Sequence, residues 1–248
     1  MGAAQACSAT RTLFTRGYGG PDDLAVYRGA VYFGDIHTDV VAKVAGGHKR
    51  IVARRLATPE GIVFRNARQM FVVEQGRNRL DIVDVRTGTI RVVNTFRNTT
   101  GLEGVDGIAS GGRGTLLIPD SPYGTLWLRK PDGSLRLLRS GFFRPVDAIR
   151  YGGGIAIADE NANAVWFLKD GTVSRLATVP TPDDLAIAAG HLYAVTLGDG
   201  GLWEVRPRVS RLPVQFRNPQ GLVDLSARVL LVADGNLNAL YRVAVSHC

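Results

Sequence analysis

Short apolar segments, each bounded by glycine, proline or acidic residues, recur along the whole chain and predict β-strands rather than helices. One four-residue motif appears six times at intervals of about 40 residues. Its copies are Pro21-Asp22-Asp23-Leu24, Pro59-Glu60-Gly61-Ile62, Val105-Asp106-Gly107-Ile108, Val146-Asp147-Ala148-Ile149, Pro182-Asp183-Asp184-Leu185 and Pro219-Gln220-Gly221-Leu222. A repeat of this length with only strands between its copies is typical of the blades of a β-propeller.

Each motif begins the inner strand of a predicted blade, and further strand-like segments follow it. The second segment ends in an acid in five copies, and the fourth segment of the fifth copy is predicted over Val209–Phe216. The pattern predicts an all-β chain: a single six-bladed β-propeller domain over residues 1–248 with four antiparallel strands per blade. The blades are predicted at about 19–56, 57–98, 99–142, 143–179, 180–216 and 217–248, the last completed by residues 8–16.

The sixth copy lacks a fourth strand because the chain ends, whereas a spare strand precedes the first copy. We expect this N-terminal strand to join the last blade and close the ring, which removes the exposed sheet edges. Cys7 and Cys248 then lie at the joined ends, and we expect a disulfide between them. Such a bond needs an oxidising compartment, so we expect a secreted or periplasmic protein, with a cytoplasmic location as the alternative.

Composition changes this picture only slightly. The chain has 248 residues, 45% of them hydrophobic, and a formal net charge of +8. It contains no apolar run long enough for a membrane span. The net positive charge invites a nucleic-acid partner, but the arginines fall mostly on predicted outer strands and rims while the acids gather elsewhere. We therefore expect a monomer with a small-molecule substrate, no nucleic-acid partner and no membrane span.

The acids form two predicted columns around one mouth of the ring, because the start of the first strand and the end of the second meet at the same face. The inner column comprises Asp22, Glu60, Asp106, Asp147 and Asp183, with Gln220 in the sixth place and Asp23 and Asp184 beside it. The second column comprises Asp35, Glu74, Asp120, Asp159 and Asp234, with Asp199 nearby. Five converging carboxylates need a cation or raise one another's pKa. Oxygen ligands suit Ca²⁺, which we expect here, or alternatively Mg²⁺ or Mn²⁺.

The remaining acids and two other side chains are candidate substrate contacts. We expect Glu60, Asp106 and the second column to line the mouth, together with His37 and with Tyr123, whose segment overhangs it. Acidic residues in turns also commonly bind local backbone, which is the structural alternative for the second column. His37 has the corresponding alternative of a solvated loop histidine.

The blade pattern, such as Pro59-Glu60-Gly61-Ile62 followed by Phe71-Val72-Val73-Glu74-Gln75-Gly76-Arg77-Asn78-Arg79-Leu80, resembles NHL-type repeats. It also resembles the superfamily of SMP-30/gluconolactonase, luciferin-regenerating enzyme and strictosidine synthase over nearly the whole chain. Gluconolactonase-type members bind a divalent cation through residues of blades one, four and five. By position, the resemblance implies Asp22, Asp147 and Asp183 as metal ligands, with Asp183 and Asp147 also catalytic. Asp replaces the family's Glu in blade one and its Asn in blade four, which makes the site more negative.

The resemblance implies a divalent-metal-dependent hydrolase that acts on a lactone or related ester in the acidic funnel. Two other functions remain open for the same fold. One is a non-catalytic NHL-like binding propeller. The other is a strictosidine-synthase-like condensing enzyme, in which the acidic mouth holds a cationic amine.

Overall fold

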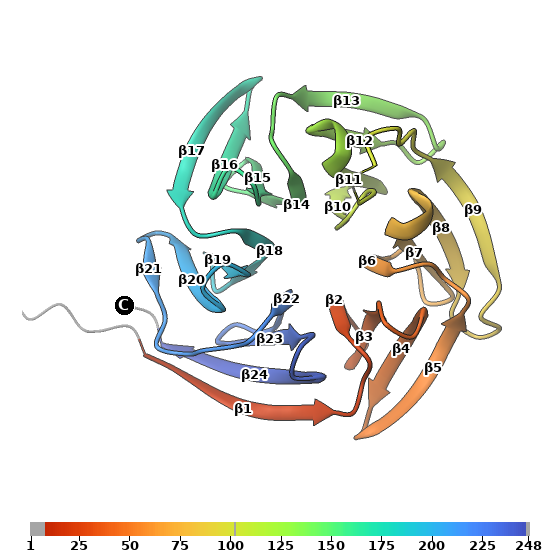
Figure 1. Cartoon of the computed structure of the whole chain (residues 1–248), viewed down its shortest axis with the longest axis horizontal. Coiled ribbons are helices and arrows are strands. Elements are labelled where there is room, and N and C mark those ends of the chain that lie inside the picture. The colour runs from red at the N-terminus through yellow and green to blue at the C-terminus, as the bar shows by residue number, and fades with distance from the viewer. Residues whose placement is uncertain (1–7, 102, 247–248) are drawn as a thin grey trace, which may run out of the picture.

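The computed structural model describes residues 8–101 and 103–246, and these form six four-stranded antiparallel sheets arranged as blades around a central axis (Figure 1). Blades one and two contain β2 (Pro21–Tyr27), β3 (Ala30–Asp35), β4 (Val40–Ala45), β5 (His48–Arg54), β6 (Pro59–Phe64), β7 (Gln69–Glu74), β8 (Arg79–Asp84) and β9 (Ile90–Thr95). Blades three and four contain β10 (Ala109–Gly112), β11 (Thr115–Asp120), β12 (Thr125–Arg129), β13 (Leu135–Ser140), β14 (Pro145–Tyr151), β15 (Gly154–Asp159), β16 (Ala164–Lys169) and β17 (Thr172–Thr178). Blades five and six contain β18 (Pro182–Ala188), β19 (His191–Thr196), β20 (Gly201–Arg206), β21 (Ser210–Arg211), β22 (Pro219–Ser226), β23 (Val229–Asp234), β24 (Ala239–Ser246) and β1 (Ser8–Arg16). The predicted all-β, six-bladed propeller is therefore confirmed.

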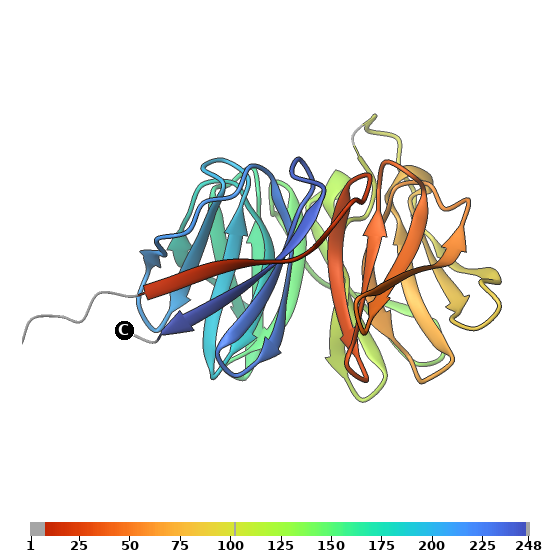
Figure 2. The ribbon, with the colours of Figure 1, turned by 90° about the horizontal axis from the view of Figure 1, so that it is seen from below.

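The ring closes as predicted, because β1 pairs antiparallel with β24 along the rim of blade six (Figures 1 and 2). The register places Ser8 opposite Ser246 and Arg16 opposite Ala239, and the Ser8 amide donates a 3.1 Å hydrogen bond to the Ser246 hydroxyl. Cys7 and Cys248 lie outside the described residues, so the disulfide between them stays a prediction.

Burial follows the order of the strands within each blade. All six residues of β3 and of β15 are buried, because the second strand has a neighbouring blade against both of its faces. The outer strand β1, in contrast, is mostly exposed. Apolar side chains fill the space between blades, as where Tyr32 and Val41 of blade one meet Met70 and Val72 of blade two. The blade contacts thus pack the inner strands around the axis.

Two blades depart from the predicted strands. In blade five the fourth strand is only β21, not Val209–Phe216, because Pro213 has no amide hydrogen to continue the ladder. In blade three the inner strand β10 begins only at Ala109. The preceding motif residues instead bond to neighbouring blades: the Val105 amide donates to Asn78 Oδ1 at 2.7 Å, and the Gly107 amide donates to the Val146 carbonyl at 2.8 Å.

Two 3₁₀ turns, η1 (Gln75–Arg77) and η2 (Ser121–Tyr123), are the helical elements among the described residues. None of the helices in that part of the chain is long and apolar enough to cross a membrane.

Candidate functional site

The inner strands carry two rings of residues around the central axis. A proline opposite the last residue of the second strand marks the register in five blades, as with Pro21 opposite Asp35 and Pro145 opposite Asp159. We call the residues one position after it, with Asp106 in blade three, the upper ring: Asp22, Glu60, Asp106, Val146, Asp183 and Gln220. The next residues form the lower ring: Asp23, Gly61, Gly107, Asp147, Asp184 and Gly221. A bulge follows the proline in all five blades, and bulges re-aim the side chains beside them.

The prediction that Asp147 is level with Asp22 and Asp183 is wrong by one residue. Asp147 lies two residues after its proline and therefore belongs to the lower ring, whereas Val146 occupies the upper-ring position of blade four. Val146 is buried in the apolar cluster between blades four and five. The register is set by Pro145 and not by the acid, because Pro145 lies opposite the last residue of the second strand, as Pro21 does in blade one.

The upper ring brings Asp22, Glu60, Asp106 and Asp183 together at the mouth of the channel. Gln75 Nε2 donates hydrogen bonds of 2.9 Å to Glu60 and 3.2 Å to Asp106. Burial and the neighbouring Asp106 raise the pKa of Asp22 to about 7. The same two causes, burial first, raise the pKa values of Glu60 and Asp183 well above their ordinary range. The charge of Asp106 thus makes ionisation of Asp22, Glu60 and Asp183 harder.

One cation, Arg144, reaches the upper ring within the described part of the chain. Its Nη2 lies 2.6 Å from Glu103 Oε2 and 3.4 Å from Asp106 Oδ2, and its Nη1 pairs with Glu160. Three carboxylates therefore share this guanidinium, and it does not neutralise the rest of the ring. In particular, Asp22 Oδ2 is buried and has no hydrogen-bond partner among the described residues.

The lower ring is tied more firmly to the backbone. Asp147 accepts hydrogen bonds from the amides of Ala148 (2.7 Å) and Leu185 (3.1 Å), and Asp184 accepts from the Leu222 amide at 2.6 Å. These bonds link blades four, five and six around the axis. Burial raises the pKa of Asp147 to about 6 and that of Asp184 well above its ordinary value.

Glycine completes the lower ring in blades two, three and six because side chains there would collide with the neighbours. A Cβ on Gly107 would lie 2.8 Å from the Val146 carbonyl oxygen and 3.4 Å from carboxylate oxygens of both Asp23 and Asp147. Below the ring, Asp23, Asp147 and Asp184 line a cavity of about 360 Å³ that otherwise has largely apolar walls. The two carboxylate rings therefore face opposite ends of the channel.

Most acids of the predicted second column accept hydrogen bonds from nearby backbone amides. Asp35 accepts from the amides of Gly19 (2.8 Å) and Gly20 (3.0 Å), the segment that leads into its own inner strand. The same arrangement recurs in blades four and six, where Asp159 accepts from the Phe143 and Arg144 amides and Asp234 accepts from the Arg217 and Asn218 amides. The geometry favours the structural alternative for these acids, and their predicted contact with substrate is untested.

Glu74 and Asp120, the other members of that column, are also buried. Glu74 accepts a 2.6 Å hydrogen bond from the Ala57 amide and pairs with Arg77 and Arg79. Asp120 Oδ1 is buried without a hydrogen-bond partner among the described residues. Asp199, which stands near the column in blade five, pairs with Arg211 at 2.9 Å.

Asp81, which sequence reasoning missed, lies fully buried beside Glu74 and 3.3 Å from Arg79 Nε. Burial and the neighbouring Glu74 raise the pKa of Asp81 to about 7. The unfolded chain loses this proton near pH 4, so the folded protein is destabilised progressively as pH rises from about 4 to about 7. We expect Asp81→Asn to raise stability at pH 8 by about 1–2 kcal/mol, or about 4 °C in Tm, and to change little at pH 5.

Thermal unfolding of both proteins at the two pH values measures this effect. Asp84→Asn, at the end of the same strand, is the contrasting variant. Hydrogen bonds, chiefly from the Thr87 amide, lower the pKa of Asp84, so its loss should destabilise the protein at pH 8. Equal or lower stability of Asp81→Asn at pH 8 would contradict the prediction.

The two other predicted substrate contacts lie at the mouth but are engaged locally. The exposed His37 forms a 2.7 Å hydrogen bond from Nδ1 to the Gly19 carbonyl, which matches the loop-histidine alternative. The Tyr123 hydroxyl accepts a 3.2 Å hydrogen bond from the Thr99 amide and lies 2.9 Å from its hydroxyl. Tyr123 thus ties down the segment that leads into β10, which rises above the other loops in Figure 2.

That segment borders a cavity of about 550 Å³ at the mouth, whose lining includes Gln75, Asn78, Asn98 and Glu103. Because Gln75 and Glu103 contact the upper-ring acids or Arg144, the cavity adjoins the ring. Sequence reasoning missed Gln75, Glu160, Glu103 and Arg144. Gln75 and Glu160 could have been identified from the sequence, since each directly follows a second-column acid and therefore starts the turn at the mouth.

The predicted ligand set Asp22, Asp147 and Asp183 is divided between the two rings. Within residues 8–101 and 103–246, no group of three or more histidine, cysteine, aspartate or glutamate side chains is arranged so as to hold a metal ion. The upper ring nevertheless offers oxygen donors of the kind that hard divalent cations prefer, with Asp22 Oδ2 unsatisfied. The donor chemistry fits such an ion, although the spacing does not form a finished ligand set.

No protein-family model matches this sequence, and no curated protein matches it. The structure is similar to a gluconolactonase from Xanthomonas campestris, with a TM-score of 0.81 at 14% identity, over 96% of this chain and 90% of that one. It is also similar to a luciferin-regenerating enzyme (TM-score 0.78, 12% identity, 96% and 95% covered) and to a Staphylococcus aureus virginiamycin B lyase (TM-score 0.73, 12% identity, 96% and 99% covered). At such identities the likeness shows the fold alone, which agrees with the predicted propeller.

Proposed function

We propose that this protein hydrolyses a lactone or related ester at the upper ring, with the help of a divalent cation, Ca²⁺ before Mg²⁺ or Mn²⁺. The observation that carries the proposal is the concentration of Asp22, Glu60, Asp106 and Asp183 at the mouth, where Arg144 alone opposes them within the described chain. Similarity of fold to gluconolactonases supports the reaction class without specifying a substrate.

A cation at the upper ring would allow its carboxylates to ionise together at neutral pH. Asp22, Asp106 and Asp183 would hold it, because Asp106 is the charge that most raises the pKa of both Asp22 and Asp183 after burial, and Asp22 Oδ2 is unsatisfied. When bound, such an ion supplies Lewis-acid polarisation of the substrate carbonyl and a lower pKa for water. Asp147, which belongs to the lower ring, is not included in this proposed set.

The proton transfers fall to Asp183. Its carboxylate takes a proton from the attacking water as the oxygen–carbon bond forms. The ring carbon–oxygen bond then breaks, and the Asp183 carboxyl returns that proton to the departing oxygen. A carboxylate can accept a proton and then return it, so one side chain serves both steps.

The substrate occupies the neighbouring cavity of about 550 Å³. Its polar lining, which includes Gln75, Arg77 and Glu103, favours a small hydroxylated ring over an apolar one. Gln75 also positions the acids, since its amide donates to both Glu60 and Asp106.

Binding of a cationic amine is the second candidate for the same ring, as in a condensing enzyme. The lack of a finished three-ligand group among the described residues favours it, because an ammonium ion needs hydrogen-bond acceptors but no fixed coordination. An amine would relieve the same crowding of negative charge.

Calcium binding separates these candidates. Calorimetric titration of the metal-free protein should show one bound ion per chain, and Asp22→Asn should weaken its binding by about tenfold or more, because ligand charge sets Ca²⁺ affinity. Hydrolysis of a panel of sugar lactones, with and without added Ca²⁺, tests the reaction itself. Binding of an aryl-ethylamine without divalent-ion binding would favour the condensing enzyme, and binding of neither would leave a non-catalytic platform.

A further inference from the structure

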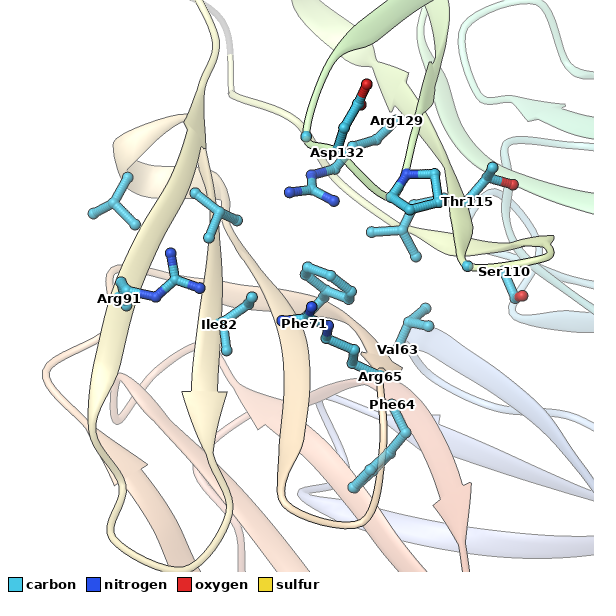
Figure 3. A pocket seen from close by; sticks show the side chains of 16 residues that line it. Val63, Phe64, Arg65, Phe71, Ile82, Arg91, Ser110, Thr115, Arg129 and Asp132 are labelled. Atoms are coloured by element: carbon cyan, nitrogen blue, oxygen red, sulfur yellow. The ribbon is translucent and has the colours of Figure 1, made fainter.

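A cavity of about 770 Å³ lies between blades two and three (Figure 3). Its lining includes turns that follow the inner strands, so it lies on the face opposite the acidic mouth. The turn between β6 and β7, the start of β9, the turn between β10 and β11, and the turn after β12 surround it. None of the residues to which a function has been assigned above lines this cavity.

A buried positive charge without an ionic partner lies in its wall. Arg129 is only 7% exposed. Its Nε donates a 2.6 Å hydrogen bond to Asn94 Oδ1, and its Nη1 donates to the Lys130 carbonyl at 3.2 Å. It forms no ion pair with any described residue, although a buried charge is costly unless it is paired. No described carboxylate lies within ion-pairing distance of the guanidinium, so a bound anion could pair with it directly.

Two more arginines share the cavity. Figure 3 shows Arg65, from the turn between β6 and β7, and Arg91, from β9, extending toward the space that Arg129 faces. Burial, followed by the nearby Arg65 and Arg91, lowers the pKa of Arg129, while Asp132 acts in the opposite sense. Asp132 is exposed and is already engaged, since its Oδ1 accepts from the Ser134 amide at 2.9 Å and from its hydroxyl at 2.8 Å.

The fixed shape of the site comes from its apolar wall. The Arg129 guanidinium lies over the Phe71 ring, 5.1 Å from its centroid, which holds the charged plane in one orientation. Ile82 and Leu116 line the same space. A Cβ on Gly133 would lie 3.2 Å from Arg129 Nη2, so the absence of a side chain at Gly133 avoids a close contact with the guanidinium.

We propose that this cavity binds a phosphate monoester with an apolar or aromatic body. Three guanidinium groups opposed by one carboxylate leave a surplus of two positive charges, which a phosphate dianion neutralises. The planar, forked donors of arginine match phosphate oxygens. The wall of Phe71, Ile82 and Leu116 accommodates the organic body. The site is separate from the carboxylate rings and does not depend on the proposed hydrolase activity.

The test is calorimetric titration of the whole protein with phenyl phosphate. Arg91→Gln, on the exposed strand β9, should weaken binding by about tenfold, the effect of losing one charge-assisted contact. Arg139→Gln removes the same charge from an exposed position on β13 outside the cavity and should bind as the parent does. Arg129→Lys keeps the charge but loses the fork, so it should also weaken binding.

Two further ligands separate the parts of the proposal. Inorganic phosphate should bind more weakly than phenyl phosphate, and phenol should not bind detectably at millimolar concentration. Failure of phenyl phosphate to bind, or equal binding by the Arg91→Gln and Arg139→Gln variants, would overturn the site. Equal affinity for inorganic phosphate and phenyl phosphate would overturn the role of the apolar wall. Lactone hydrolysis is not a readout in any arm, so this result is independent of the proposed function.

Discussion

Asp183→Asn is expected to lower kcat for lactone hydrolysis by about 10²–10⁴-fold while the propeller stays folded, because asparagine cannot accept and return the proton of the attacking water. Asp183 lies in the upper ring, where burial and the charges of Asp106 and Asp22 raise its pKa. Removing its charge also relieves repulsion among the remaining acids, so the variant should unfold at a temperature no lower than the parent.

The measurement is steady-state hydrolysis of the best lactone of the panel, accompanied by a thermal melt of each protein. Asp170→Asn is the matched control, since Asp170 is exposed in a turn of blade four at a positive φ that asparagine tolerates. The control should keep the parent's kcat. Full activity of Asp183→Asn would remove Asp183 from the mechanism and would transfer the search to Asp22, Asp106 or Glu60.

The fold could be predicted because each blade begins with a variant of the same short sequence motif. The proline–acid motif marks each inner strand, and the missing strand at one end matches the spare strand at the other. The exceptions came from chemistry that a motif does not convey. Pro213 ended β21 early, and the motif of blade three bonds to neighbouring blades instead of to its own sheet.

The site was predicted less well, because a one-residue error in register moves a side chain from one ring to the other along the axis. Alignment by the acids put Asp147 in the upper ring, whereas alignment by the prolines puts Val146 there. Arg144 could not be identified from the repeat, because it contacts Glu103 and Asp106, which belong to another blade. Contacts between side chains from different blades leave no periodic signal in the chain.

The placement of charge explains how a chain with a formal charge of +8 can offer an acidic site. Carboxylates crowd the axis, where neighbouring blades exclude water, and arginines gather between blades two and three at the opposite face. Each cluster lacks enough opposite charge among the described residues. The two regions are therefore suited to ligands of opposite sign, which the net charge alone conceals.

The metal-free protein is expected to lose stability as pH rises from about 5 to 8, by several kcal/mol or about 10 °C in Tm. The cause is the pair of carboxylate rings. Burial is the first cause that raises the pKa of Asp147 to about 6 and that of Asp22 to about 7, and it is also the first cause that raises the pKa values of Glu60 and Asp183 well above their ordinary range. In the unfolded chain the same groups ionise near pH 4.

The direction follows from proton binding. Between about pH 4 and 7 the folded state holds more protons on these groups than the unfolded state, so its stability falls with rising pH. Carboxylates of lowered pKa, such as Asp84 and Asp132, have the opposite effect, but that effect is complete above about pH 4. They therefore do not cancel the loss.

Thermal melts at pH 5 and 8, with chelator or with Ca²⁺, measure the effect. Calcium should restore most of the loss at pH 8 and have little effect at pH 5, because it stabilises the ionised ring and competes with protons for it. Asp22→Asn should flatten the pH dependence even with chelator, since one buried carboxyl no longer titrates. A chelated protein whose Tm is unchanged or higher at pH 8 would mean that the rings carry their charge without a cation, and both the calcium site and the amine alternative would lose their physical basis.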